Sequence, residues 1–342
     1  LLLEEAHLPF EMDPHTLDSL GSWNFYGKLK TSMTAHPKVD PASGELVFYS
    51  YMTAGPLSDG MELHKVGADG FLSESHPFTA PYASMVHDFV VTENYIVFPL
   101  MPLTASMDRI MEGKPPLAWE PEQGTRVGVM PRNGTPADLT WYEGSMPCYA
   151  FHCMNGYDKD GVITFEACLN DHAPLFPTVD GASTGPTNPR PARFQLDLNA
   201  ANSKARIDYI SDSFAEFPVI DPRYAMRDYR HCWFTSSDQT LPHTVPDAEW
   251  AYNALEHFDV HSGKSDRYAF ANGMPSEPIF VPKSAGAGEG EGYILSVVYD
   301  FCSNTSDLCV FDARDLAAGP LGRARVSHRV PVCFHGTWKP GN

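Results

Sequence analysis

Short runs of β-branched and aromatic residues, separated by turn sequences, constrain the fold of this chain more than any other feature. The runs lie at 45–52, 89–100, 161–169, 206–210, 293–299 and 308–311. Clusters rich in Gly, Pro, Asp and Ser separate them, and apolar residues at helical spacing are scarce. This pattern predicts an all-β chain of antiparallel hairpins, as in a propeller, a sandwich or a barrel. No clear repeat is present, so the pattern does not choose among the three.

A loop-rich segment at 173–193 interrupts the pattern. Strand signals resume on both sides of it, so we interpret the segment as an elaborated loop within one domain that spans residues 1–342. With 43% hydrophobic residues, a chain of this length can bury a substantial core. The sequence begins at Leu1 rather than at a methionine, and we therefore expect that an N-terminal portion has been lost.

The formal net charge of −19 argues against nucleic acid as a partner, because such a chain repels phosphate backbones. No apolar run approaches the roughly 20 residues of a membrane-spanning helix. The odd number of cysteines and the lack of a C-x-x-C pair predict reduced, buried thiols in a cytoplasmic protein. Peripheral contact with a membrane stays open, and the sequence predicts no oligomeric state. The cysteines are Cys148, Cys153, Cys168, Cys232, Cys302, Cys309 and Cys333.

Most of the 14 histidines lie among polar or turn-forming neighbours, and nothing in their spacing requires a metal. The pair His257 and His261 would share one face of a helix and could then bind zinc. The segment 256–264, however, alternates and then turns at Ser262, Gly263 and Lys264, which is typical of a hairpin. We therefore expect no metal at this pair.

Four other histidines have a different setting. Each lies beside an apolar or β-rich run and is followed by a residue suited to a bend. Because they are spread along almost the whole chain, only the global fold could bring them into one site, and spacing alone does not establish it. They are His36, His87, His152 and His335.

The motifs around these histidines resemble those of the carotenoid cleavage oxygenase family, which includes the retinal pigment epithelial membrane protein and bacterial lignostilbene dioxygenases. The match consists of six motifs in the family's order. They are Ala35-His36-Pro37-Lys38-Val39-Asp40-Pro41, His87-Asp88-Phe89-Val90-Val91-Thr92-Glu93-Asn94-Tyr95, Phe151-His152-Cys153-Met154-Asn155-Gly156-Tyr157, Glu216-Phe217-Pro218, Pro275-Ser276-Glu277-Pro278 and Phe334-His335-Gly336-Thr337-Trp338.

This resemblance implies a seven-bladed β-propeller, with loops and short helices that cap the metal face. It also implies that His36, His87, His152 and His335 form the catalytic centre and hold one Fe(II) per chain, with dioxygen as co-substrate. Imidazole suits iron, but it suits zinc, copper and nickel as well, so the choice of iron comes from the family.

The family also uses three glutamates that accept a hydrogen bond from the other ring nitrogen of a ligand histidine. The matching positions are Glu5, Glu216 and Glu277. Glu4 competes with Glu5 for the first position. The other ten histidines are expected to contribute no ligand.

By resemblance, the enzyme would cleave a conjugated C=C bond of a carotenoid or apocarotenoid to two carbonyl products. The alternative is a stilbene-type substrate. Stilbene cleavers of the family typically carry a lysine just before the first glutamate, and Glu4 stands at that position if Glu5 is the histidine partner. Two rivals are a noncatalytic lipid-binding propeller and a retinoid isomerase. The apolar small-molecule substrate would enter beside 98–103 if that segment is exposed; otherwise the segment is a buried strand end.

Overall fold

The computed structural model describes residues 1–241, 252–332 and 334–341. His243 and Cys333 lie outside the described residues. Of the described cysteines, all are free and only Cys302 is exposed. The described part of the chain is mostly β-sheet, which confirms the all-β prediction. Its helices are short: α1 (Met107–Met111), η1 (Pro121–Gln123), η2 (Pro136–Asp138), η3 (Pro222–Tyr224) and η4 (Leu316–Ala318).

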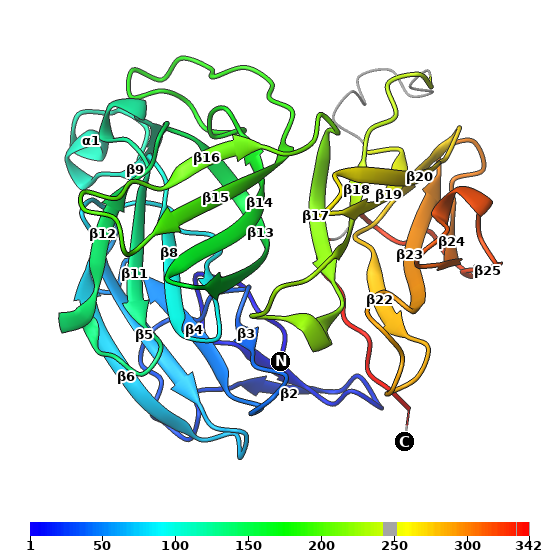
Figure 1. Ribbon diagram of the computed structural model, residues 1–342, viewed down its shortest axis with the longest axis horizontal. Coiled ribbons are helices and arrows are strands. Elements are labelled where there is room, and N and C mark those ends of the chain that lie inside the picture. The colour runs from blue at the N-terminus through cyan, green and yellow to red at the C-terminus, as the bar shows by residue number, and fades with distance from the viewer. Residues whose placement is uncertain (242–251, 333, 342) are drawn as a thin grey trace.

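Five antiparallel sheets of four or five strands follow one another along the chain (Figure 1). The first sheet contains β3 (Lys38–Val39), β4 (Leu46–Tyr51), β5 (Gly60–Val66) and β6 (Leu72–Thr79). The second contains β7 (Val90–Val91), β8 (Tyr95–Leu100), β11 (Arg126–Pro131) and β12 (Thr140–Glu143). The third contains β13 (Tyr149–Lys159), β14 (Val162–Asn170), β15 (Arg190–Asp197) and β16 (Arg206–Tyr209).

The fourth sheet contains β17 (Ala215–Ile220), β18 (His231–Ser236), β19 (Ala254–Asp259) and β20 (Lys264–Ala269). The fifth contains β21 (Gly273–Pro275), β22 (Ile279–Pro282), β23 (Gly292–Asp300), β24 (Thr305–Asp312) and β25 (Gly322–Arg325). Two smaller ribbons complete the described strands. They are β1 (Phe10–Met12) with β2 (Ser19–Ser22), and β9 (Leu103–Ala105) with β10 (Leu117–Trp119).

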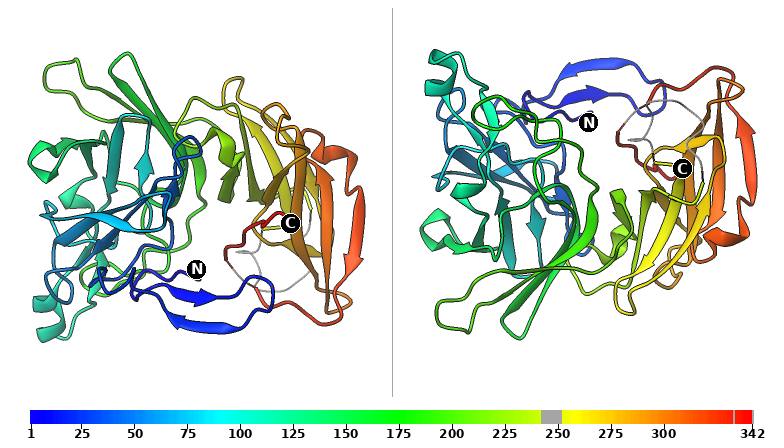
Figure 2. Two further views of the ribbon diagram at one scale, coloured as in Figure 1. Left: turned by 90° about the horizontal axis from the view of Figure 1, so that it is seen from below. Right: turned by 90° about the horizontal axis from the view of Figure 1, so that it is seen from above.

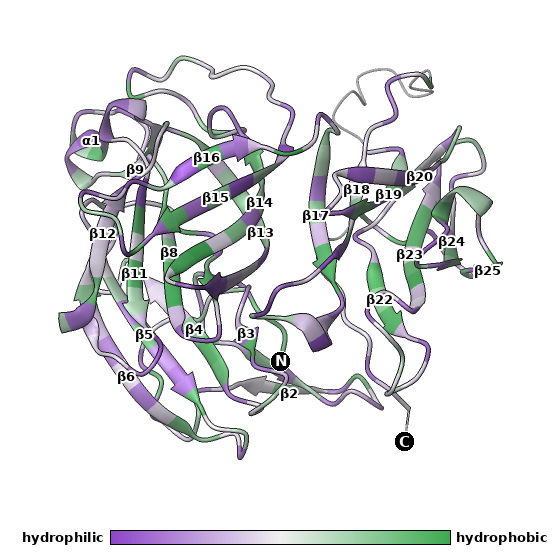
Figure 3. Cartoon of the chain, viewed as in Figure 1, coloured by the Kyte–Doolittle hydropathy of each residue, from purple (hydrophilic) through white to green (hydrophobic). Residues whose placement is uncertain are grey.

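The five sheets are arranged around one axis, as the views in Figure 2 show. The inner strands β7, β13, β17 and β22 contact one another in that order, so each sheet presents an early strand to the axis. Side chains of neighbouring sheets pack together between them; Val97 and Phe165, for example, share one cluster across the second and third sheets. The core is therefore a series of layers between sheets, while strands such as β20 carry more hydrophilic residues (Figure 3). The described residues form five sheets of this size, so the count of seven blades stays a prediction.

Local sequence explains the strand boundaries. In β23, buried and partly exposed residues alternate, as expected for a strand with one covered face. Almost all of β14 is buried, because sheets pack on both of its faces. Asp160 and Gly161 both have positive φ, at 52° and 79°, which gives the two-residue turn that joins β13 to β14.

The predicted runs correspond to strands, with one division. The run at 89–100 forms both β7 and β8, because Thr92 and Tyr95 are hydrogen-bonded across a turn between the two strands. The loop after β14 joins it to β15, its neighbour in the same sheet. The candidate entrance at 98–103 is buried: Phe98, Leu100 and Leu103 are at most 1% exposed, so this segment is a strand end and not an entrance. Among the described residues, no helix has both the length and the hydrophobicity needed to cross a bilayer.

Candidate metal centre

Four histidines from distant parts of the chain meet near the axis. His36 precedes β3, His87 precedes β7, His152 lies near the start of β13, and His335 lies in the segment after β25. One ring nitrogen from each lies within 4.8 Å of the others. Among the described residues, no other His, Cys, Asp or Glu set of three or more is grouped in this way.

The rings pack edge to face around a small central volume. The ring centroid of His36 lies 4.6 Å from that of His87, 5.0 Å from that of His152 and 4.7 Å from that of His335. The Nε2 atoms of His36 and His87 are 3.0 Å apart. His152 is buried, whereas His335 is exposed. The cluster is thus closed on the side of the third sheet and open on the side of the C-terminal segment.

Three of the four rings are fixed by glutamates. The Nδ1–H of His87 donates to Glu5 at 2.9 Å, that of His152 donates to Glu216 at 2.6 Å, and that of His335 donates to Glu277 at 2.9 Å. A proton on Nδ1 leaves Nε2 with its lone pair free to face the centre.

Glu4, the competitor for the first position, contacts the exposed His7 instead. Each of two glutamates is held in turn by a backbone N–H, from Phe217 at 2.8 Å and from Gly336 at 3.0 Å. Of the two neighbouring candidates, Glu5 is the one that contacts a histidine of the cluster.

Burial and nearby charges shift the pKa values of two cluster histidines in opposite directions. Burial lowers the pKa of His36 well below its usual value. Burial also lowers the pKa of His152, but the charge and hydrogen bond of Glu216 outweigh it and raise the pKa. The buried carboxylate of Asp88 has a pKa of about 2, because Lys38, His36 and backbone hydrogen bonds outweigh the effect of its burial.

The donor set fits a bound metal ion. The Nε2 atom of His152 is buried and has no hydrogen-bond partner among the described residues. A buried nitrogen without a partner costs free energy unless something else satisfies it. Four imidazoles suit iron, zinc, copper or nickel, so the geometry alone does not choose among these metals.

Aromatic side chains that sequence reasoning did not single out surround the cluster. The Phe151 ring lies 5.4 Å from His87, and the Phe217 ring lies 5.2 Å from His152 and 5.9 Å from His335. Phe217 has a positive φ of 57°, a strained conformation that is uncommon for a bulky side chain. Phe151 is next to His152 and Phe217 is next to Glu216 in the sequence. This adjacency could have identified both residues as neighbours of the site.

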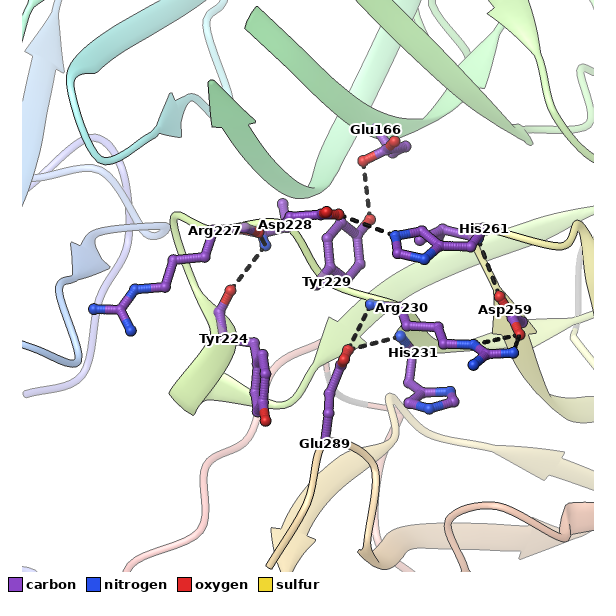
Figure 4. Close-up of polar contacts among 12 residues, drawn as sticks. Glu166, Tyr224, Arg227, Asp228, Tyr229, Arg230, His231, Asp259, His261 and Glu289 are labelled. Carbon is purple, nitrogen blue, oxygen red and sulfur yellow. Dashed lines mark hydrogen bonds and ion pairs between the residues drawn. The ribbon is translucent and has the colours of Figure 1, made fainter. Parts of the chain in front are cut away.

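The pair His257 and His261 lies on the hairpin of β19 and β20, as expected. The two residues have separate partners. His257 contacts His231 at 2.8 Å, whereas His261 contacts Asp228 at 3.0 Å, as Figure 4 shows. Both lie near a polar region in which Arg230, directly before β18, pairs with Asp259 of β19 (Figure 4). The two histidines therefore face different partners within a network of paired charges.

Comparison with known proteins places these features in context. The model of the retinal pigment epithelial membrane protein family matches residues 1–340. Isoeugenol monooxygenase of Pseudomonas putida is 34% identical, and the match covers 100% of this chain and 73% of that protein. Lignostilbene-alpha,beta-dioxygenase isozyme III of Sphingomonas paucimobilis is 32% identical, with 96% and 69% covered. The crystal structure of Pseudomonas brassicacearum lignostilbene dioxygenase superposes with a TM-score of 0.94 at 36% identity, covering 99% of this chain and 72% of that one.

Proposed function

The chain belongs to the retinal pigment epithelial membrane protein family, and on that premise we propose that it is a non-haem Fe(II) dioxygenase that cleaves a conjugated carbon–carbon double bond. The convergence of four imidazoles carries the proposal, since three of them are oriented by glutamates from separate segments. The relatives described above are named as oxygenases, which supports the same reaction class.

In this proposal His36, His87, His152 and His335 hold one iron ion per chain. Bound Fe(II) would supply the activation of dioxygen, which is the co-substrate. The protein itself positions the substrate beside the metal and excludes water from the site. Glu5, Glu216 and Glu277 keep the Nδ1 proton on three rings, so that each Nε2 stays a neutral donor aimed at one point.

The aromatic residues beside the cluster form an apolar wall. Phe151 and Phe217 contact ligand rings directly, so an alkene that packs on them would lie beside the metal. Such packing orients one double bond and keeps water away from it. No side-chain acid or base of this chain is required for the cleavage itself.

The substrate is the finer part of the proposal. A carotenoid or apocarotenoid is our first candidate, because Glu4 stands where stilbene cleavers of the family typically have lysine, and its side chain is 59% exposed. The relatives named for isoeugenol and lignostilbene favour a second candidate, an alkene conjugated to a phenolic ring.

The test measures metal and products together. Purified protein is analysed for iron by mass spectrometry and then incubated with a panel of apocarotenoids, stilbenes and isoeugenol under ¹⁸O₂. We expect near-stoichiometric iron and two carbonyl products from one substrate class, with ¹⁸O in the products. Protein that holds iron but consumes no dioxygen with any alkene would instead support a noncatalytic lipid-binding protein.

Several broader expectations belong to the same proposal. A single seven-bladed propeller domain is supported by five sheets around one axis. We further propose that the protein acts in the cytoplasm on an apolar small molecule, with at most peripheral membrane contact and without nucleic acid, in keeping with the charge of −19.

A further inference from the structure

A cavity of about 280 Å³ lies among the inner strands β3, β7, β13 and β17. Its lining residues include Val39, Val91, Ile220, Ala225 and Met226. None of these residues belongs to the histidine cluster or to its glutamates.

Many of the residues that line the cavity follow three of the ligand histidines along the chain. Pro37 follows His36, Phe89 to Val91 follow His87, and Cys153 to Gly156 follow His152, and all of these line the cavity. The histidines stand at the starts of inner strands, and the cavity lies further along the same strands. Tyr149 and Phe151, by contrast, precede His152 on β13. The strand direction therefore puts the cavity on the side of the cluster opposite Phe151.

The wall of the cavity offers no free polar side chain. Of its lining residues, Lys38 and Asn155 alone have polar side chains. Lys38 Nζ donates to Asp88 at 2.7 Å. The Asn155 amide donates to the carbonyls of Tyr224 and Arg227, both at 3.1 Å, and accepts from the Met226 N–H at 3.0 Å. A cavity with an apolar wall does not hold water firmly and takes up apolar guests such as xenon.

We propose that this cavity takes up dioxygen and supplies it to the histidine cluster from the side opposite Phe151. The inference rests on the proposed function, in which dioxygen and a bulky alkene must reach the same metal. An alkene packed on the aromatic wall would block the approach from that side. A second, apolar route lets a small apolar gas arrive while the alkene is bound.

The size of the cavity argues against the alkene as its occupant. Pockets for drug-sized ligands measure roughly 300 to 1,000 Å³. A carotenoid is longer than such ligands, and the cavity of about 280 Å³ is smaller than those pockets. A diatomic gas fits easily, and so does xenon.

The first experiment uses xenon as a probe and needs neither iron nor turnover. Crystals of the protein are pressurised with xenon, and anomalous scattering locates the bound atoms. We expect xenon beside Ile220 and Met226, and we expect it to be lost in an Ala225→Phe variant, whose ring would fill the cavity. Ordered water in place of xenon would overturn the proposal, because the wall would then be wet.

The second experiment measures steady-state kinetics with dioxygen and the alkene varied separately. Ala225→Phe should raise the KM for dioxygen severalfold and leave the iron content and the KM for the alkene unchanged. Ala317→Phe, at an exposed position of η4 far along the chain, is the matched control for added bulk. If Ala225→Phe does not fold, Ile220→Phe fills the same space.

The outcomes separate the two proposals. A folded variant that binds no xenon but keeps the wild-type KM for dioxygen shows that dioxygen uses another path, and the inference fails while the proposed function stands. Wild-type protein that binds xenon here but retains no iron and oxidises no alkene shows that the proposed function is wrong, and the dioxygen route fails with it.

Discussion

At the scale of single residues, each glutamate beside the cluster holds one histidine in one tautomer. Glu216 is 6% exposed and accepts from both His152 and the Phe217 N–H. Glu277 accepts in the same way from His335 and the Gly336 N–H. An imidazole without such a partner can rotate and can place its proton on the wrong nitrogen, so it is a poorer ligand.

We predict that Glu216→Gln and Glu277→Gln each weaken metal retention by about tenfold to a hundredfold. Gln keeps the shape of the side chain but lacks the charge that favours the Nδ1 proton. The measurement is the metal content after dialysis against a series of chelator concentrations. Glu4→Gln is the control, since the hydrogen-bond partners of Glu4 within the described residues are His7 and the Ala6 backbone N–H. Retention equal to wild type in both glutamate variants would contradict the assignment.

The sequence alone could indicate candidate ligands but not their convergence. His36 and His335 are almost a chain length apart, and they meet only because the sheets turn around an axis, which no local pattern encodes. The family resemblance supplied the grouping that spacing could not. It could not separate Glu4 from Glu5. The side chains of adjacent residues point in different directions, and the sequence does not say which of the two faces the cluster. It also gave no hint of the cavity, whose wall consists of ordinary strand residues.

His64 lies away from the cluster, and its burial has a measurable effect on the stability of the protein. His64 is 1% exposed in β5, and its ring contacts Thr31, Ser50 and Ser75. Burial lowers the pKa of His64 from its usual 6.5 to about 4. Well above pH 6.5 the ring is neutral in both the folded and the unfolded chain, so its contribution to stability is complete there.

We predict that the free energy of unfolding falls as the pH decreases from 6.5 to 4, because the unfolded chain then binds a proton that folded His64 does not. The difference between these pKa values corresponds to about 3 kcal/mol at most. Urea denaturation at pH 7 and pH 5 measures the loss. His64→Gln should show a smaller loss than wild type, and His328→Gln, at an exposed position, should match wild type. The same loss in all three proteins would rule out His64 as its source.

At the scale of elements, hairpins with specific turns define the sheets. The Asp- and Gly-containing cluster at 158–161, one of those that separate the strand runs, connects β13 to β14 and fixes the register in which Lys159 faces Val162. This turn could be predicted from Asp160 and Gly161, because a two-residue turn of this type requires positive φ at both positions and these residue types adopt it readily. The break between β7 and β8 was not readable, because Thr92 makes its turn through hydrogen bonds to Tyr95 within an otherwise strand-like run.

We predict that Gly161→Ala destabilises the protein by about 1 kcal/mol or more. At a φ of +79° a Cβ atom is strained, and it would also lie 2.3 Å from Asn199 Nδ2. Thermal unfolding monitored by circular dichroism measures the change. Gly286→Ala is the matched control, because Gly286 does not have positive φ and a Cβ there meets nothing within 4 Å. Equal melting temperatures for the two variants would show that the turn tolerates a side chain.

At the scale of the whole molecule, the four ligands join the two ends of the described chain. Three histidines lie in or before the inner strands of the first three sheets, whereas His335 lies in an exposed segment without regular structure. Within the described part of that segment, Phe334 is 70% exposed and Trp338 is 47% exposed, so apolar packing contributes little to holding it. Its clearest attachments near the axis are the two hydrogen bonds to Glu277.

A metal bound by all four rings would therefore stabilise the C-terminal segment more than any other part of the fold. We predict that removing the metal with a chelator increases backbone hydrogen exchange at 334–341 and leaves exchange in the buried strand β14 unchanged, because β14 is held by its neighbours on both sides. Hydrogen exchange with mass spectrometry on metal-loaded and metal-free protein measures both regions in one experiment. His335→Ala should reproduce the faster exchange even with metal present, since the other three ligands remain together without it. If exchange at 334–341 is the same with and without metal, His335 is not a ligand, and the site is a three-histidine site.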